Sequence, residues 1–355
     1  MRRILTGLIS LTLPAIFLIS CNNKQMATQN IDQPPVTLVI HGGAGTILRG
    51  NMTAEREAEY RQKMEEALNA GYAILEQGGS SLDAVEAVIA LLEDSPLFNA
   101  GKGSVFNNKG KIEMDASIMD GKTLNAGAVA GVSNVKNPIK LARLVMDKSP
   151  HVMMVGDGAV DFGNLWDIQM ESDEYFKTTH RWQQLQDAQK TDTIQLDHAA
   201  PGNGSKGKGY SPKKDDQKYG TVGAVALDKK GNIAAATSTG GTTNKKYGRI
   251  GDSPIIGAGT YAENGVCGIS STGTGEYFIR LMVAYDIAAL MKYRNLSIDE
   301  AARIVIHEKL KNLGGDGGVV GLDSKGNVIM EFNTEGMYRG LIREKGNPQV
   351  FIYKP

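Results

Sequence analysis

Residues that build metal sites and disulfides are scarce in this sequence, which has two cysteines and five histidines among 355 residues. The histidines are scattered, with no His-x-x-x-His pair, and the two cysteines are far apart. A zinc-type site made of side-chain ligands is therefore not indicated. We expect an ordinary structural or surface role for each histidine.

An excess of charge is also missing, because Lys and Arg total 39 and Asp and Glu total 39. Nucleic-acid-binding proteins usually carry a basic surplus or a basic stripe, so no nucleic-acid partner is expected. The run His41-Gly42-Gly43-Ala44-Gly45 lacks the Lys-Ser/Thr of a P-loop. No G-x-S-x-G elbow occurs either, so the sequence does not indicate an α/β-hydrolase triad.

The one long apolar run lies at the N-terminus, where Arg2 and Arg3 precede apolar residues 4–19. It is too short, and too soon followed by polar residues, to indicate a transmembrane helix, and it is typical of an export signal. It ends in Leu18-Ile19-Ser20-Cys21, which looks like a bacterial lipobox. An ordinary secretory signal with an incidental cysteine is the alternative.

On this interpretation residues 1–20 are a lipoprotein signal peptide, Cys21 is the lipidated residue and 21–35 is a tether. We expect the protein to be exported and held by its lipid at the periplasmic face of a bacterial membrane or at the cell surface. Cys267 is then the only cysteine of the folded part, so no disulfide is expected within it.

Strands and helices are predicted in blocks along the rest of the chain. Strands are expected at 36–40, closed by a glycine turn at 41–45, and at 112–119, 126–133 and 151–156. Helices are expected at 54–77, after Ser80, from Asn137-Pro138, at 274–293 and after Ser297. Two similar hairpins have the turns 227–232 and 322–327, which suggests shared turn chemistry. Blocks of this kind favour an α+β fold of sheets packed face to face and covered by helices, over a doubly wound parallel sheet.

The most informative position is the junction Tyr219-Gly220-Thr221-Val222-Gly223, where a polar run becomes an apolar strand. Residues 163–190 are charged and aromatic and are expected to be partly helical, and 191–220 have the composition of a disordered linker. A Gly-Thr bond at such a border is a candidate self-cleavage site. Cleavage would give Thr221 both a hydroxyl and a free amine, the minimum for an N-terminal nucleophile.

Three groups of residues after Thr221 suggest a site around it. Thr239 ends the second strand of the hairpin that Thr221 begins, so the two lie near each other. Arg249 and Asp252 form a loop pair that suits the carboxylate and ammonium of an amino acid, although an exposed ion pair is the ordinary alternative. The glycine-rich turn 270–276 leads from a strand into a helix and suits an oxyanion hole.

Together these motifs resemble the isoaspartyl peptidase/L-asparaginase family of N-terminal nucleophile hydrolases, the plant-type asparaginases. The resemblance covers nearly all of residues 36–355. It rests on the segments His41-Gly42-Gly43-Ala44-Gly45, Pro96-Leu97-Phe98-Asn99-Ala100-Gly101, Met114-Asp115-Ala116-Ser117, Gly220-Thr221-Val222-Gly223, Thr237-Ser238-Thr239-Gly240-Gly241, Gly248-Arg249-Ile250-Gly251-Asp252-Ser253 and Thr272-Gly273-Thr274-Gly275-Glu276. It implies the four-layer αββα sandwich of those hydrolases. It also implies one globular domain formed by an α-subunit (36–220) and a β-subunit (221–355).

The resemblance also implies a role for each site residue. Thr221 would be the nucleophile, freed by cleavage of the Gly220-Thr221 bond, with Thr239 supporting its hydroxyl. Arg249 would hold the substrate α-carboxylate, and Asp252 the α-amine, with help from the Gly275 carbonyl. Thr272 and the Gly273 amide would form the oxyanion hole, and Asn99 would help to fix the Thr221 amine.

No cofactor is expected for catalysis, but the resemblance implies a structural sodium ion and a homodimer of αβ units. The sodium loop would use the backbone carbonyls of Leu92, Glu93, Ser95, Phe98, Ala100 and Lys102, which leave no side-chain signature. The expected activity is hydrolysis of β-aspartyl dipeptides and L-asparagine. Two alternatives are glycosylasparaginase, which typically has His-Asp-Thr where this chain has Tyr219-Gly220-Thr221, and an inactive amino-acid-binding lipoprotein.

Overall fold

The computed structural model describes residues 36–190 and 220–355, which form twelve strands together with α-helices and short 3-10 and π-helical segments. The strands are β1 (Thr37–Gly45), β2 (Met114–Asp120), β3 (Ala126–Val132), β4 (Met153–Val155), β5 (Val222–Leu227), β6 (Ile233–Thr239), β7 (Thr260–Glu263), β8 (Cys267–Gly273), β9 (Gly317–Asp323), β10 (Val328–Phe332), β11 (Gly336–Ile342) and β12 (Gln349–Tyr353). The helices are η1 (Arg49–Asn51), α1 (Ala54–Glu76), α2 (Ser81–Glu93), η2 (Gly101–Gly103), α3 (Pro138–Lys148), α4 (Gly156–Asn164), α5 (Asp173–Phe176), α6 (Thr179–Lys190), α7 (Gly275–Leu281), α8 (Val283–Arg294), α9 (Ile298–Arg303), η3 (Ile304–Leu310) and α10 (Lys311–Leu313).

Eight strands form the larger sheet, in the order β12-β11-β1-β5-β6-β2-β3-β4. All neighbours in it are antiparallel except β3 and β4. Successive side chains of a strand point to opposite faces, and both faces of this sheet are buried. In β5, for example, Ala224 and Ala226 belong to the core under the helices, whereas Val225 and Leu227 belong to the core shared with the second sheet. Thr221 and Thr239 share the side of the second group, which faces the second sheet.

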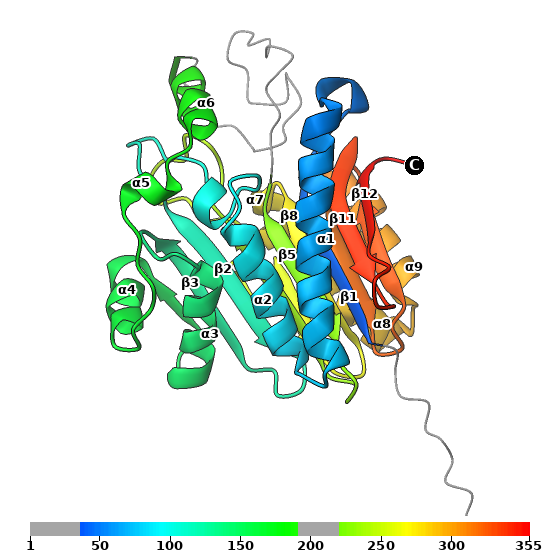
Figure 1. Cartoon of the computed structure of the whole chain (residues 1–355). Coiled ribbons are helices and arrows are strands. Elements are labelled where there is room, and N and C mark those ends of the chain that lie inside the picture. The colour runs from blue at the N-terminus through cyan, green and yellow to red at the C-terminus, as the bar shows by residue number, and fades with distance from the viewer. Residues whose placement is uncertain (1–35, 191–219) are drawn as a thin grey trace, which may run out of the picture. The chain divides into compact units, whose positions relative to one another are not determined.

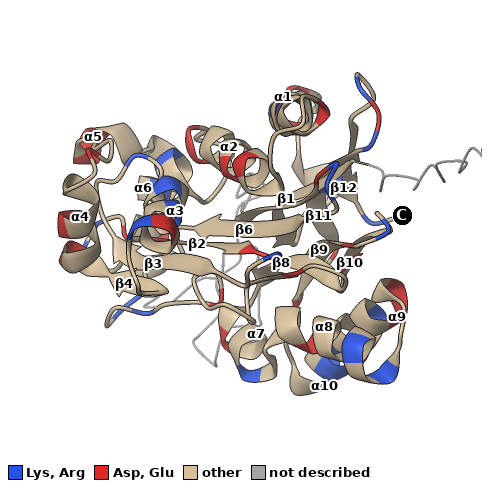
Figure 2. Ribbon diagram, turned by 90° about the horizontal axis from the view of Figure 1, so that it is seen from below, with Lys and Arg blue, Asp and Glu red and all other residues tan. Residues whose placement is uncertain are grey.

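The smaller sheet has the antiparallel order β10-β9-β8-β7, and its strands β7, β8 and β9 pack against β1, β5, β6 and β2 of the larger sheet. Helices α1, α2 and α3 contact the outer face of the larger sheet, and α8 and α9 contact the smaller one. Figure 1 shows α1 and α2 lying across the larger sheet, and Figure 2 shows helices on both sides of the two sheets. The expected α+β class, with antiparallel sheets and helical cover, is confirmed.

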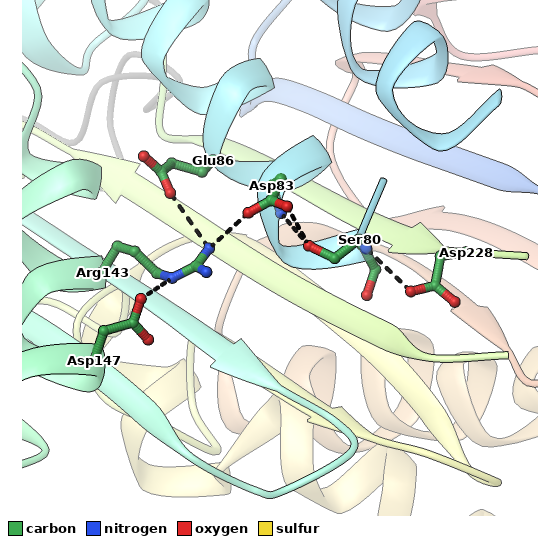
Figure 3. Close-up of polar contacts among 7 residues, drawn as sticks. Ser80, Asp83, Glu86, Arg143, Asp147 and Asp228 are labelled. Carbon is green, nitrogen blue, oxygen red and sulfur yellow. Dashed lines mark hydrogen bonds and ion pairs between the residues drawn. The ribbon is translucent and has the colours of Figure 1, made fainter. Parts of the chain in front are cut away.

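Polar contacts fix the start of α2 against its surroundings (Figure 3). The Ser80 hydroxyl caps the helix by accepting a hydrogen bond from the backbone N–H of Asp83 at 3.1 Å. Arg143 of α3 forms ion pairs with Asp83 and Glu86 of α2 and with Asp147 of its own helix. These contacts join two of the helices that cover the larger sheet.

Two local predictions need correction, and one helix was not predicted. The run His41-Gly42-Gly43 is not a turn after a strand but part of β1, which continues to Gly45 through a register shift between His41 and Gly43. The helix expected at 274–293 is two helices, since Met282 has a φ of 49° and separates α7 from α8. Helix α4 had no prediction, because its glycine-rich sequence carries a weak helical signal.

The two hairpin turns do share their chemistry, as predicted. In the first, Asp228 accepts hydrogen bonds from the backbone N–H groups of Lys230 and Asn232. In the second, Asp323 accepts the same bonds from Lys325 and Asn327. In each turn an aspartate side chain accepts hydrogen bonds from the backbone N–H groups of the tight connection.

Candidate active site

A pocket of about 530 Å³, its open mouth included, lies where β5, β6 and β8 meet the loops that follow them. Most of the site residues expected from the sequence line it: Asn99, Gly220, Thr221, Thr239, Arg249, Asp252, Thr272 and Gly273. Gly275 adjoins the same groups, because a Cβ placed on it would lie 3.0 Å from the Asp252 carboxylate. Segments more than 170 residues apart in sequence, from Asn99 to Gly273, are therefore brought to one place.

Thr221 lies at the base of the pocket beside Thr239. The β5–β6 register pairs Val222 with Ser238, which sets Thr221 and Thr239 opposite each other one residue further along. The Thr221 hydroxyl donates a hydrogen bond to the Thr239 Oγ1, with 3.0 Å between the oxygens. The Thr239 Oγ1 also accepts from the backbone N–H of Gly241 at 3.0 Å, which holds it in place. The predicted neighbourhood of the two threonines is present.

Arg249 and Asp252 line the same pocket, but the two side chains differ in their hydrogen-bond partners. Arg249 donates two hydrogen bonds to Glu276, from Nε to Oε1 and from Nη2 to Oε2, each at 2.9 Å. Asp252 is 5% exposed, and its Oδ2 has no hydrogen-bond partner among the described residues. Burial raises the pKa of Asp252 to about 7, against the opposing effect of Arg249. The pocket therefore has a guanidinium fork near a buried carboxylate with one oxygen that forms no hydrogen bond among the described residues.

Glu276 was not assigned a role from the sequence, although it stands in the Thr272–Glu276 motif. Its side chain is 54% exposed, and its pKa is lowered because the bonds and charge of Arg249 outweigh the effect of burial. The same pairing raises the pKa of Arg249 against the opposing effect of its burial. A carboxylate of the protein thus occupies the fork that was expected to hold a carboxylate of the substrate.

The turn after β8 supplies the third side of the pocket. Gly273 ends that strand, and a Cβ placed on it would come 2.4 Å from the Asp316 carbonyl oxygen. Only glycine fits there, so the turn brings its backbone close to the opposite loop. Thr274 donates its backbone N–H to the same carbonyl at 3.0 Å.

Asn99 contacts the junction through its backbone rather than its side chain. Its backbone N–H donates to the Gly220 carbonyl oxygen at 3.3 Å. Its side chain is engaged elsewhere, since Nδ2 donates to the Gly241 carbonyl at 2.7 Å and Oδ1 accepts from the Val105 N–H at 3.0 Å. The role in which Asn99 helps to fix the Thr221 amine stays a prediction, because that amine would exist only after cleavage.

His41 is a contact of the site that the sequence did not reveal. It is fully buried in β1, with Nδ1 3.1 Å from the Thr221 carbonyl oxygen and Nε2 3.0 Å from the Ser270 hydroxyl. Burial lowers its pKa to about 3, so the ring is neutral near pH 7. The only signal in the sequence was its position in the His41–Gly45 motif. Both partners lie more than 170 residues away.

The described residues contain no cluster of three His, Cys, Asp or Glu side chains that could hold a metal ion. Backbone carbonyls gather instead in the loop between α2 and η2. A Cβ on Gly103 would lie 2.0 Å from the Phe98 carbonyl oxygen and 2.9 Å from that of Pro96. A Cβ on Gly101 would lie 2.3 Å from the Glu93 carbonyl oxygen. The two glycines therefore leave room for a group of carbonyl oxygens.

Comparison with known proteins gives a consistent result. A family model described as asparaginase matches residues 34–352. The isoaspartyl peptidase of Escherichia coli (strain K12) is 50% identical over 321 residues, which cover 87% of this chain and 97% of that protein. A putative isoaspartyl peptidase/L-asparaginase of Dictyostelium discoideum is 48% identical over 322 residues, 86% of this chain and 92% of that protein. The isoaspartyl peptidase/L-asparaginase of Homo sapiens is 40% identical over 304 residues, which cover 85% of this chain and 91% of that protein.

The comparisons correct the prediction of an exported protein with a lipid anchor at Cys21, which is wrong. These relatives are named as isoaspartyl peptidases, none of those three names denotes a lipoprotein, and the family match begins only at residue 34. The prediction rested on the composition of residues 1–24, and a short basic and apolar run is not specific to exported chains. Cys21, the tether and linker residues 191–219 lie outside the described residues. Among the helices that are described, none is long and apolar enough to cross a membrane.

Proposed function

Because this chain belongs to the asparaginase family and is a hydrolase of its isoaspartyl peptidase/L-asparaginase group, we propose that it hydrolyses β-aspartyl dipeptides and L-asparagine with Thr221 as nucleophile. The observation that carries the proposal is the pocket itself. In it, the Thr221 hydroxyl is hydrogen-bonded to Thr239, and the Arg249 guanidinium and the unpartnered Asp252 oxygen belong to the same pocket. The amino acid end of an aspartyl substrate carries a carboxylate that suits Arg249 and an ammonium that suits Asp252.

The proposed maturation is self-cleavage of the Gly220-Thr221 bond. The Thr221 hydroxyl attacks the Gly220 carbonyl carbon, the C–N bond breaks, and the Thr221 amine leaves with the proton of the hydroxyl, so that Gly220 is held as an ester on Oγ1. Water hydrolyses this ester, which frees the Thr221 hydroxyl and the Gly220 carboxylate. The Asn99 N–H already donates to that carbonyl oxygen, which suits a group that stabilises its negative charge during attack. The products are an α-subunit ending at Gly220 and a β-subunit of residues 221–355.

The substrate binds by its α-amino acid end. Its α-carboxylate takes the place of the Glu276 carboxylate on Arg249, and its ammonium binds the free Asp252 oxygen, helped by the Gly275 carbonyl. A side chain at residue 275 would obstruct this arrangement, since its Cβ would lie 2.9 Å from the Arg249 Nη2 and 3.0 Å from the Asp252 Oδ1. The charges at one end of the substrate thus aim its β-carbonyl at Thr221.

The reaction then proceeds in two steps. The free amine of Thr221, with a reference pKa of about 7.7–8.0, takes the proton of its own hydroxyl, and Oγ1 attacks the β-carbonyl carbon. Thr272 and the Gly273 N–H stabilise the oxyanion, and ammonia or the peptide amine leaves with the proton. Water then hydrolyses the β-aspartyl ester, which releases aspartate and restores Thr221.

We extend the proposal to the architecture. The two packed sheets with helices on both sides support the four-layer αββα sandwich of N-terminal nucleophile hydrolases. Two αβ units are proposed to form a homodimer, which light scattering of the purified protein checks by its mass.

A structural sodium ion is proposed for the loop after α2. The carbonyls of Leu92, Glu93, Ser95, Phe98, Ala100 and Lys102 would hold it, and the space that Gly101 and Gly103 leave beside the Glu93 and Phe98 oxygens fits such an ion. Its contribution would be to stiffen the segment that carries Asn99. A thermal midpoint that does not differ between NaCl and choline chloride at equal ionic strength would contradict it.

Substitution of Thr221 tests the proposed function. Thr221→Ala removes the nucleophile, so the purified protein is expected to remain one chain of 38.1 kDa, without activity on β-Asp-Leu or L-Asn. Thr221→Ser keeps the hydroxyl and the amine and is expected to retain part of both cleavage and activity. An Ala variant that still yields two subunits on a denaturing gel would refute the assignment.

A further inference from the structure

Five of the buried polar side chains between the two sheets form one connected group. They are His41, Ser117, Thr237, Thr260 and Ser270, and each has 0% exposure. In the larger sheet they form one transverse row, because His41 is opposite Gly223, Gly223 is opposite Thr237, and Thr237 is opposite Ser117. In the smaller sheet Thr260 is opposite Ser270. The fold has thus aligned two rows of polar groups face to face.

These groups form a continuous chain of hydrogen bonds that ends at Thr221. Ser117 Oγ lies 2.7 Å from Thr260 Oγ1, which lies 2.6 Å from Thr237 Oγ1. Thr237 Oγ1 lies 2.6 Å from Ser270 Oγ, which is 3.0 Å from His41 Nε2. His41 Nδ1 then reaches the Thr221 carbonyl oxygen at 3.1 Å. At the far end Ser117 also contacts the Ser253 carbonyl at 2.6 Å, next to Asp252.

The chemistry of the two ends fixes the direction of this chain. The Thr221 carbonyl can only accept, so the single proton of a neutral imidazole belongs on Nδ1. Nε2 must then accept the proton of Ser270, whose other acceptor, the Ala236 carbonyl, is slightly further away at 3.1 Å. Thr237 then donates to Ser270 at 2.6 Å, since its other acceptor, the Gly259 carbonyl, is further away at 3.1 Å. Thr260 in turn donates to Thr237, and Ser117 to Thr260. Ser117 has one proton for two acceptors, Thr260 and the Ser253 carbonyl.

Gly223 is the residue that makes room for this arrangement. A Cβ on it would lie 2.0 Å from Ser270 Oγ and 2.1 Å from His41 Nε2, in the middle of the bond between them. The glycine that follows Thr221 and Val222 in the junction motif therefore has a specific structural use. Because Gly223 has no side chain, Ser270 of the smaller sheet can form a hydrogen bond with His41 of the larger sheet.

We infer that His41 and the four hydroxyl groups behind it form a one-directional hydrogen-bond relay that positions the Thr221 nucleophile by its carbonyl group. Donors aligned in one direction polarise one another, and in a dry layer each bond is strong. This inference rests on the proposed function of Thr221. After cleavage Thr221 has lost its upstream neighbour, so a hold on its carbonyl is one of the few restraints that keep its hydroxyl and amine in place.

Two substitutions of Thr237 separate the relay from simple packing. Thr237→Val keeps the shape and removes the hydroxyl, whereas Thr237→Ser keeps the hydroxyl and loses a methyl group. The relay predicts that the Val variant loses between about tenfold and a hundredfold in kcat, with KM within about twofold, and that the Ser variant stays near the unaltered enzyme. A packing role predicts the reverse order of the two variants. Loss of self-cleavage in the Val variant alone supports the relay, and equal kcat values for Val and the unaltered enzyme overturn it.

Neighbouring serines of β8 give a matched pair of controls. Ser270→Ala removes a member of the relay and is expected to lower kcat in the same way as Thr237→Val. Ser271→Ala removes an equally buried hydroxyl that bonds only the Ala258 carbonyl, at 3.2 Å, and is expected to leave kcat unchanged. Equal losses in the two variants would overturn the relay.

A spectroscopic measurement keeps the test independent of activity. Nitrogen NMR of histidine-labelled Thr221→Ala protein, with the His41 signals identified by their loss in His41→Gln, reports which ring nitrogen carries the proton. The relay requires the neutral Nδ1–H tautomer at pH 7, and an Nε2–H tautomer or a charged ring overturns it. An active Thr221→Ala protein would instead refute the proposed nucleophile, while the tautomer would still decide the relay.

Discussion

The carboxylates of Asp252 and Glu276, both near Arg249, differ in their exposure and in their partners. Asp252 is buried without a cation, whereas Glu276 is half exposed and occupies the Arg249 guanidinium with two hydrogen bonds. In the proposed binding mode an incoming α-carboxylate displaces Glu276 from the Nε and Nη2 donors of Arg249. On that proposal Glu276 competes with the substrate for Arg249.

Glu276→Gln is expected to tighten substrate binding. The neutral amide binds Arg249 more weakly than a carboxylate does, and an exposed ion pair contributes up to about 1 kcal/mol, so KM should fall by up to about fivefold. Steady-state kinetics with β-Asp-Leu measures this. A KM that rises tenfold at unchanged stability would show instead that Glu276 is needed to orient Arg249.

The same substitution should alter the pH dependence of binding. Asp252 must be ionised to bind an ammonium, and with a pKa raised to about 7, mainly by burial, its charge is lost as the pH falls through 7. The negative charge of Glu276 contributes to raising that pKa, so its removal should shift the loss of binding to lower pH. The inhibition constant of L-aspartate between pH 5 and 8 measures the shift, and an unchanged profile would contradict it.

For single residues, the sequence predicted several members of the pocket, among them Thr221, Arg249 and Asp252. It did not predict His41 or Glu276 as site contacts. The bonds of His41 join segments 180 and 229 residues apart, and no local pattern encodes such a pairing. Glu276 differs from a solvated helix residue only through Arg249, which a separate loop presents.

At the scale of elements, one of the two matched turns has an additional contact. Asp228 accepts from its own turn and also from the backbone N–H of Ser81 at the start of α2, at 3.2 Å. Asp323 makes the corresponding turn bonds, and among the described residues its side chain accepts hydrogen bonds within its own turn. The first turn therefore also anchors a helix, as Figure 3 shows.

Alanine substitutions in the two turns should differ for this reason. Asp228→Ala is expected to lower the free energy of unfolding by about 2–3 kcal/mol, and Asp323→Ala by about 1 kcal/mol less, because the first leaves one more buried donor without a partner. Urea denaturation in the Thr221→Ala background, where the chain stays single, provides the comparison. Equal losses would mean that the Ser81 contact contributes nothing.

Elements with strong local signals were predicted well. Helices α1 and α2 have polar caps at Thr53 and Ser80, and the hairpin turns have their aspartates. The failures occurred where tertiary packing overrides local preference. The left-handed Met282 divides one apolar pattern into two helices, and Gly43 and Gly45 belong to β1 because β11 pairs with them.

At the scale of the molecule, the proposed cleavage divides the chain but not the sheet. Strand β1 precedes Gly220, yet it pairs with β5 on one side and β11 on the other, and β2 pairs with β6. Both products contribute to both cores. Each proposed subunit alone would expose strand edges and large apolar faces.

The two products of cleavage are therefore expected to remain together. Native size-exclusion chromatography of the matured enzyme should give one peak that contains both chains in equal amounts, and only denaturant should separate them. Recovery of a folded β-subunit by ion exchange without denaturant would contradict this prediction.

The position of β1 also sets the order of events during synthesis. This strand leaves the ribosome first among the described strands, but its partner β11 spans Gly336–Ile342, close to the end of the chain. The middle of the larger sheet therefore stays incomplete until translation is almost finished, and such late long-range pairing is slow. A nascent chain that has exposed Gly220 and Thr221 still lacks this frame, so the proposed self-cleavage belongs to the released protein and not to the growing one.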